Sequence, residues 1–354
     1  MARKKSAGKS GLRWSELSPG EWNHKKLLSY LAAFEGRKVL VVGDVGVDRY
    51  TEGRVERISP EAPVPIVQVT KETHKLGLAA NVADNVQAVG GTAMLVGVVG
   101  GDSDAEVFRG LLREARISDR TLVVDSGRRT ILKERVVSER QQLLRIDYED
   151  THALPAAMDA KILGQIERAL AACDVVIVED YAKGLLKPSI CAEIVAMARA
   201  KKKWIAADPN PRSPRENYRG VSVITPNTRE AEALTGVRII DEATLFEAGR
   251  KLLAMTEGES AIITRGKEGM AIFQAGSAEV IGIPTYAREV YDVSGAGDTV
   301  IAVLSMARAV GASLQEAAIL SNLAAGVEVG KRGTATVSRD EIRAALTFVT
   351  ALTG

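Results

Sequence analysis

The segment Asp292-Val293-Ser294-Gly295-Ala296-Gly297-Asp298-Thr299 lies near the C-terminus and leads into the apolar residues 300–304. Two glycines around an alanine predict a tight turn that opens a buried helix. The first backbone amides of a helix lack partners within it and carry the positive end of its dipole, so they suit a phosphate group. Gly295, Ala296 and Gly297 are therefore the candidate anion hole, since a side chain at either glycine would hinder close approach of a phosphoryl group.

Asp298 follows this turn directly, where a carboxylate would repel a bound phosphate. Its position makes sense if the carboxylate takes a proton from a hydroxyl group that attacks the phosphorus. The alternative is an ordinary aspartate at a helix N-terminus, and this segment alone leaves the two interpretations about even. An anion hole beside a base indicates phosphoryl transfer to an alcohol.

Short apolar runs that end in polar residues recur along the chain. They occupy residues 37–44, 92–99, 175–180, 204–208, 223–227 and 261–266. Stretches with helical spacing separate them, at 79–89, 104–116, 156–172, 188–201, 228–234 and 243–255, and residues 314–330 and 340–353 also indicate helices. This alternation predicts an α/β fold, a doubly wound and mostly parallel sheet flanked by helices. Ligands bind such sheets at the carboxyl ends of the strands.

Two segments interrupt the alternation, near residues 48–75 and 128–147. Their mixed polarity predicts exposed strands of a small sheet, a β lid over the open edge of the large sheet. We therefore expect one domain over residues 21–354 that includes this lid. Residues 1–20 are polar and rich in glycine after a basic start, which predicts a disordered arm.

The composition excludes several classes of function. The chain has 47 Lys and Arg against 45 Asp and Glu, a net charge of +2, and 4% aromatic residues, which argues against nucleic-acid binding. Cys173 and Cys191 lack metal-ligand spacing and fit a reduced cytoplasmic setting. No apolar run is long enough to cross a bilayer, and no apolar region follows the basic first residues as in a secretion signal. We expect a cytoplasmic protein without nucleic-acid or membrane partners.

Separated motifs over roughly residues 35–350 resemble the ribokinase-like (PfkB) carbohydrate kinases. They are GDVGVDRY at 43–50, ISPEAPVP at 58–65, RQQLLRID at 140–147 and DYAKG at 180–184. Within that family they look like the D-glycero-β-D-manno-heptose 7-phosphate kinases of lipopolysaccharide core synthesis. The resemblance implies ATP as phosphoryl donor, Mg²⁺ as cofactor and a sugar phosphate as acceptor. It makes Asp298 the general base, which needs no large pKa shift because the hydroxyl becomes acidic as the O–P bond forms.

The resemblance also points to residues that bind the sugar. Asp44 and Asp48 are candidates to accept hydrogen bonds from sugar hydroxyl groups. Gly77 and Asn81 match a second signature over residues 77–83, with Gly77 passing close to the sugar and Asn81 bonding it. Leu78 replaces the second glycine that this signature usually has.

A sugar phosphate also needs cations for its distal phosphate. Asp180 and Lys183 match the fourth motif, and the third motif contributes Arg140 and Gln142 to the substrate-binding residues. Arg135 and Arg145 are further candidates for the phosphate. For each of these basic residues taken alone, a solvated surface charge is the alternative.

Asn227 and Glu230 have the Asn-x-x-Glu spacing that organises Mg²⁺ and phosphates through water in similar kinases. Mg²⁺ takes few protein ligands and keeps several waters, so a sparse acidic site is reasonable. The alternative for Glu230 is an acid that favours the helix dipole.

Other matches concern the nucleotide and a second ion. Thr264, Gly266 and Gly269 look like the nucleotide loop, and Asn322 with Gly326 match a helix that flanks adenine, although plain helix packing also explains Gly326. Some similar kinases bind a monovalent cation such as K⁺ at the positions of Asp292 and Ser294.

These residues predict ATP-dependent phosphorylation of D-glycero-β-D-manno-heptose 7-phosphate at its anomeric O1, giving heptose 1,7-bisphosphate. The alternatives are another sugar kinase, acting on ribose, a fructose phosphate or a keto-deoxy sugar acid, and a non-catalytic sugar or nucleotide sensor on the same fold. Many similar proteins carry a second, nucleotidyltransferase domain. Because this chain ends at Gly354, we expect the kinase domain alone. The exposed lid strands predict a homodimer through the lid.

Overall fold

The computed structural model describes residues 12–138, 141–286, 290–331, 333 and 335–351. Within them, one nine-stranded sheet has the order β1-β15-β14-β13-β12-β11-β10-β2-β5. From β1 to β5 its strands are Arg13–Glu16, Glu279–Ile283, Met270–Gln274, Ser260–Thr264, Val223–Ile224, Trp204–Asp208, Val175–Glu179, Lys38–Gly43 and Thr92–Val96. All neighbours pair in parallel except β13 with β14 and β14 with β15. The predicted doubly wound, mostly parallel α/β class is confirmed.

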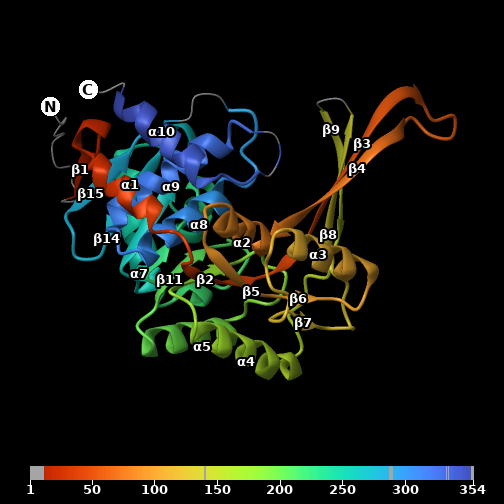
Figure 1. The fold of residues 1–354 in the computed structure, drawn as a ribbon, viewed down its shortest axis with the longest axis horizontal. Coiled ribbons are helices and arrows are strands. Elements are labelled where there is room, and N and C mark those ends of the chain that lie inside the picture. Colours follow the sequence, from red (N-terminus) through yellow and green to blue (C-terminus); the bar gives the residue numbers. More distant parts are fainter. Residues whose placement is uncertain (1–11, 139–140, 287–289, 332, 334, 352–354) are drawn as a thin grey trace.

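Helices cover both faces of this sheet (Figure 1). One face carries α1 (His24–Ala32), α2 (Ala79–Ala88), α3 (Ser103–Glu114), α8 (Ala296–Ala309), α9 (Leu314–Glu328) and α10 (Arg339–Ala351), and the other carries α4 (Asp159–Leu170), α5 (Pro188–Ala200), α6 (Thr228–Thr235) and α7 (Glu242–Thr256). Successive side chains of a strand point to opposite faces, so Val39 and Val41 enter one core, and Leu40 and Val42 the other. Burial on both faces explains why these strands are continuous apolar runs.

A second sheet of the described residues has the order β4-β3-β8-β9. Its strands are β3 (Val45–Ile58), β4 (Pro65–Leu78), β8 (Ile131–Ser138) and β9 (Gln141–Tyr148), and they include both segments expected as lid strands. The ends of β3 and β4 extend well beyond the body of the protein (Figure 1). A short parallel pair, β6 (Val98–Val99) with β7 (Val123–Val124), lies near the base of this lid.

The expected disordered arm over residues 1–20 is wrong for its last part. Arg13–Glu16 form strand β1, which pairs in parallel with β15, and Pro19–Glu21 form a short 3₁₀ helix. A tertiary contact orders this segment, because Trp14 lies against Gly282 of β15. The polarity of the neighbouring residues does not predict that contact. Residues 1–11 lie outside the described part. No helix within the described ranges combines the length and apolar character that a membrane span requires.

Candidate active site

A cavity of about 650 Å³ opens where β10, β11 and β13 end and α8 begins. Residues from six separate stretches of the chain converge on it, as expected at the carboxyl edge of a parallel sheet. The sequence-predicted residues that line it are Asp180, Asn227, Glu230, Thr264, Gly266, Gly269, Ala296, Gly297, Asp298, Asn322 and Gly326.

The start of α8 forms one wall of this cavity. Gly295 is the N-cap residue with φ 95°, a left-handed conformation that glycine adopts without the strain of a side chain. The helix behind it is buried from Thr299 to Ala307, which fixes its N-terminus in place. A Cβ at Gly297 would stand 3.5 Å from Asp208 Oδ2, so a side chain here would enter the space between the helix and that carboxylate. The geometry is that of an anion hole.

Both carboxylate oxygens of Asp298 accept hydrogen bonds from distant parts of the chain. Asn81 Nδ2 donates to Oδ2 at 2.6 Å, and the Tyr181 hydroxyl donates to Oδ1 at 2.9 Å. Burial raises the pKa of Asp298 to about 6, and these two hydrogen bonds oppose the rise. Burial also raises the pKa of Tyr181, so its hydroxyl keeps its proton and stays a donor. Asp298 is thus an oriented carboxylate at neutral pH, as a general base must be.

Asn81 and Tyr181 have a partner that the sequence did not indicate. Asn81, expected to bond the sugar, donates its amide to Asp298 in this structure, and its contact with a sugar stays a prediction. Tyr181 was not singled out, although it lies in the DYAKG motif next to Asp180. The motif could have indicated Tyr181 as a candidate site residue, but only the fold brings its hydroxyl to Asp298.

Three carboxylates crowd the floor of the cavity. Glu179 ends β10, Asp208 ends β11 and Asp298 lies in the first turn of α8, and ligand atoms of the three lie within 4.8 Å of one another. Burial and mutual repulsion raise the pKa of Glu179 and of Asp208 well above the ordinary range. Among the described residues, Glu179 Oε2 has no hydrogen-bond partner.

Such a cluster is costly unless protons or a cation offset the charge. Carboxylate oxygens around a water-filled cavity are the donor set that Mg²⁺ prefers, so these residues fit that ion. The sequence placed an acid at the end of each strand but gave no sign that the two strand ends are neighbours. Glu179 and Asp208 are the residues that the sequence interpretation missed.

Asn227 and Glu230 form a reciprocal cap at the start of α6. Asn227 Oδ1 accepts from the Glu230 amide at 3.0 Å, and Glu230 Oε2 accepts from the Asn227 amide at 2.8 Å. This reciprocal cap gives Glu230 a structural role at the helix start, and both residues also line the cavity. Burial raises the pKa of Glu230, and its charge also raises that of Asp208. Its role toward Mg²⁺ stays a prediction.

The opposite end of the cavity contains the predicted nucleotide residues. Arg265 N–H donates to Gly269 O at 2.7 Å and closes the loop that follows β13. Gly269 has φ 79°, and a Cβ there would overlap the carbonyl oxygen of Ile283. Across the cavity, Asn322 Nδ2 on α9 donates to Pro284 O at 2.7 Å, and Gly326 follows one turn later.

Asp44, Asp180 and Lys183 hold a loop of the protein instead of standing free. Asp44 accepts from the amides of Lys183 at 2.9 Å and Leu185 at 3.2 Å, and burial raises its pKa to about 6. Asp180 accepts from the Tyr218 hydroxyl at 2.7 Å. These side chains have protein partners here, and their contact with a sugar stays a prediction.

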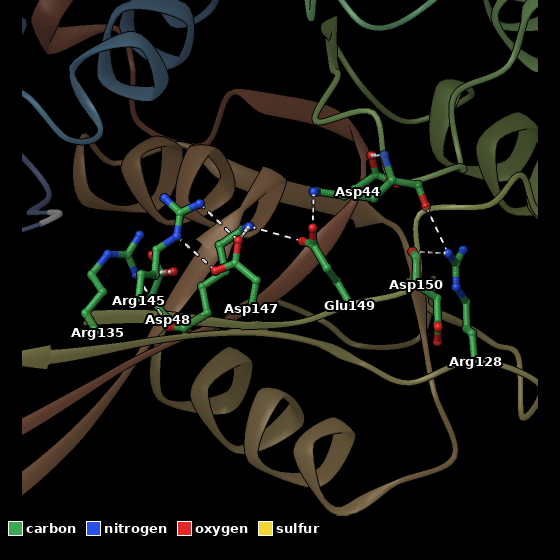
Figure 2. A network of polar contacts seen from close by, with 10 residues as sticks. Asp44, Asp48, Arg128, Arg135, Arg145, Asp147, Glu149 and Asp150 are labelled. Carbon is green, nitrogen blue, oxygen red and sulfur yellow. Dashed lines mark hydrogen bonds and ion pairs between the residues drawn. The ribbon is translucent and has the colours of Figure 1, made fainter. Parts of the chain in front are cut away.

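Figure 2 shows the ion pairs that join this loop to the lid. Glu149 lies between Lys183 and Lys133, with its oxygen 3.1 Å from Lys133 Nζ, and Asp147 lies between Lys133 and Arg145. Of the cations expected for a distal phosphate, Lys183 and Arg145 thus belong to this network, each beside a carboxylate. Arg140 lies outside the described residues, and Gln142 is exposed near the start of β9.

Asp48 on β3 pairs with Arg135 on β8 at 2.7 Å (Figure 2). A Cβ on Gly77 would stand 3.1 Å from Asp48 Cγ, so the glycine lets β4 pass this side chain. Leu78, where a glycine is usual, has φ 59° and ψ −138°. It therefore keeps a glycine-like backbone at some cost in strain while its side chain is buried.

Asp292 and Ser294 form a tight turn before α8, in which the Ser294 amide donates to Asp292 Oδ1 at 2.9 Å. Glu328, at the end of α9, is buried nearby. Burial raises its pKa to about 8, with a further contribution from the charge of Asp292. The carboxylate of Asp292 therefore favours the protonated, neutral form of Glu328 beside this turn.

The oriented carboxylate and the acidic floor beside the first turn of α8 fit a phosphotransferase with an alcohol as acceptor. A family model described as pfkB family carbohydrate kinase matches residues 37–341. The chain belongs to this family, and it is a sugar kinase.

Known proteins resemble the chain to different degrees. It is 42% identical over 324 residues to the bifunctional protein HldE of Geobacter sulfurreducens and 45% identical over 313 residues to that of Caulobacter vibrioides. These matches cover 92% and 88% of this chain but only 66% and 64% of the relatives' own lengths.

Solved structures show the same fold. A ribokinase of Arabidopsis thaliana complexed with ribose and ATP has a TM-score of 0.71 at 18% identity and covers 89% of this chain and 99% of its own. Phosphofructokinase-2 of Escherichia coli in complex with potassium has a TM-score of 0.74 at 17% identity, with the same two coverages.

Proposed function

We propose that the protein transfers the γ-phosphoryl group of ATP to O1 of D-glycero-β-D-manno-heptose 7-phosphate, in the synthesis of ADP-heptose for the lipopolysaccharide core. The single observation that carries catalysis is Asp298, held by Asn81 and Tyr181 beside the first amides of α8. The substrate is supported by the motifs at 58–65 and 140–147 and by the HldE relatives.

In the proposed reaction the ATP phosphates lie against the amides of Ala296 and Gly297. Asp298 accepts the proton of the sugar hydroxyl while the O–P bond forms, and ADP leaves toward the loop at Gly266 and Gly269. Glu179 and Asp208 would hold Mg²⁺, which would neutralise phosphate charge when bound. Closure of the lid over the sugar would exclude water, the competing acceptor.

The lid cations would recognise the phosphate at the far end of the sugar. Lys133, Lys183 and Arg145 are neighbours through Glu149 and Asp147, so a phosphate could take the place of a carboxylate at one of them. Arg140 stays a candidate on sequence grounds. A monovalent cation such as K⁺ at Asp292 and Ser294 is part of the proposal, supported by the Asp292 carboxylate in the turn before α8.

Release of ADP, measured with a panel of acceptors, tests the substrate. We expect kcat/KM with heptose 7-phosphate to exceed that with ribose, fructose 6-phosphate and a keto-deoxy sugar acid by about 10²-fold or more, because a site built for a distal phosphate loses charge-assisted bonds with the others. A higher value with another sugar would replace the substrate but keep the kinase. No ADP release with any acceptor would favour the sensor.

The lid also supports a proposed homodimer. Ile58 on β3, Val69 on β4 and Leu144 on β9 are 60%, 55% and 55% exposed, an apolar face on a sheet with open edge strands. We expect light scattering to give the wild type a mass of twice 37.8 kDa. The double variant Ile58→Asp with Val69→Asp should have the mass of one chain. Ile240→Asp, at a 73% exposed position on the body, is the control and should stay dimeric. A wild-type monomer at micromolar concentration would contradict the dimer.

A further inference from the structure

The segment of residues 12–22 packs against the nucleotide end of the cavity. Strand β1 extends the main sheet beyond β15, with Arg13 N–H donating to Ala278 O at 2.9 Å and Leu17 N–H to Gly282 O at 2.8 Å. Two of the three tryptophans of the chain, Trp14 and Trp22, lie here. Each contacts a residue that is next in the sequence to one lining the cavity: Trp14 contacts Arg265, and Trp22 contacts Tyr286.

Trp14 holds the loop that follows β13. The Arg265 guanidinium lies over the indole ring at 5.7 Å from its centroid and is also paired with Glu268. The indole fills the space that a side chain at Gly282 would need, and it stacks on Phe246 with ring centroids 6.4 Å apart. Arg265 is therefore held on one side by Trp14 and on the other by Glu268. It directly precedes Gly266, which lines the cavity.

Trp22 holds the segment that crosses the other wall. Its ring meets Tyr286 edge to face, with centroids 5.3 Å apart and planes at 87°. Tyr286 follows Thr285, which lines the cavity, and Pro284, whose carbonyl accepts from Asn322 on the predicted adenine helix. Trp22 Nε1 donates to Leu17 O at 3.4 Å and ties this contact to the end of β1.

We infer that residues 13–22 form a brace that presets the nucleotide-binding walls, and that Trp14 and Trp22 are positioning residues for ATP. A loop held in its binding conformation before the ligand arrives costs less to order on binding, so the brace raises nucleotide affinity. It acts from outside the cavity, because neither tryptophan is among the described residues that line it. The inference rests on the proposed nucleotide role of the 264–269 loop.

The test is calorimetric titration of ADP with Mg²⁺ into Trp14→Leu, which keeps apolar volume against Gly282 but removes the ring from Arg265. We expect the ADP dissociation constant to rise by about fivefold or more, since a partly desolvated cation–π contact is lost and the loop loosens. In the kinase assay KM for ATP should rise similarly, with KM for the sugar and kcat unchanged. Trp14→Phe should recover part of the affinity.

Trp204→Leu is the matched control. Its ring also lies under an arginine, Arg308 at 5.4 Å, but Trp204 begins β11, and the cavity lies at the other end of that strand. It should bind ADP as the wild type does. Equal ADP affinity of Trp14→Leu and the wild type, or equal weakening in both leucine variants, would overturn the brace. A wild type that does not bind ADP would instead overturn the proposed function.

Discussion

Replacing Asp298 by asparagine should lower kcat by about 10³-fold while leaving the ADP dissociation constant within about twofold of the wild-type value. Loss of a positioned general base costs about 10² to 10⁴ in rate, and donors from two distant segments of the chain hold this carboxylate in the cavity. The asparagine keeps the shape of the side chain. A coupled ADP-release assay and a binding titration make the comparison.

A companion substitution separates the base from its orientation. Tyr181→Phe removes one hydrogen bond to Asp298 and leaves the other, from Asn81, so we expect a smaller loss in kcat, about tenfold. The circular dichroism spectrum and melting temperature of both variants control for folding. A kcat for Asp298→Asn above about a tenth of the wild-type value would remove Asp298 from the base role.

Glu179→Gln should have opposite effects on stability and on activity. Glu179 is buried beside Asp208 and Asp298, and burial followed by their charges raises its pKa well above the ordinary value of 4.5. A carboxyl with a raised pKa in the folded state binds its proton more tightly there, so its contribution to stability falls as pH rises above 4.5. The glutamine removes this cost. We expect a higher melting temperature than the wild type at pH 8 and little difference near pH 4.

The same substitution should lower kcat by about 10²-fold and raise the Mg²⁺ concentration needed for half-maximal rate. The reason is that a neutral amide is a weaker ligand for a hard divalent cation than a carboxylate is. Asp84→Asn on α2 is the control. Burial raises the pKa of Asp84 as well, but this residue is not among those found on the cavity wall.

We expect the control to keep its kcat and its Mg²⁺ dependence. An unchanged Mg²⁺ dependence of Glu179→Gln would place the ion elsewhere. If Glu179→Gln melted at a lower temperature than the wild type at pH 8, the ionised carboxylate cluster would not destabilise the folded state.

The sequence predicted the strands and helices well where burial is uniform along an element. The runs at 37–44, 175–180 and 204–208 became β2, β10 and β11 because side chains buried on both faces leave a continuous apolar signal. The turn at residues 295–297 could be predicted because a glycine in the left-handed region is a local requirement. The lid segments could be predicted because they interrupt the alternation of strands and helices. Their ion pairs, such as Asp48 with Arg135, could not be predicted from the sequence.

By itself, then, the sequence determined the α/β class and the glycine turn that opens α8, since both depend on neighbouring residues. It also predicted that this turn is an anion hole and that Asp298 is the base. The tertiary structure alone decided which distant groups meet there. Asn81 and Tyr181 reach Asp298 across 217 and 117 residues, and Glu179 meets Asp208 because β10 and β11 are neighbours in the sheet. It also placed Trp14 against Arg265 and Trp22 against Tyr286, although Trp14 belongs to the segment expected to be disordered. Periodicity and polarity report how each residue is buried, whereas strand order and packing set its partners.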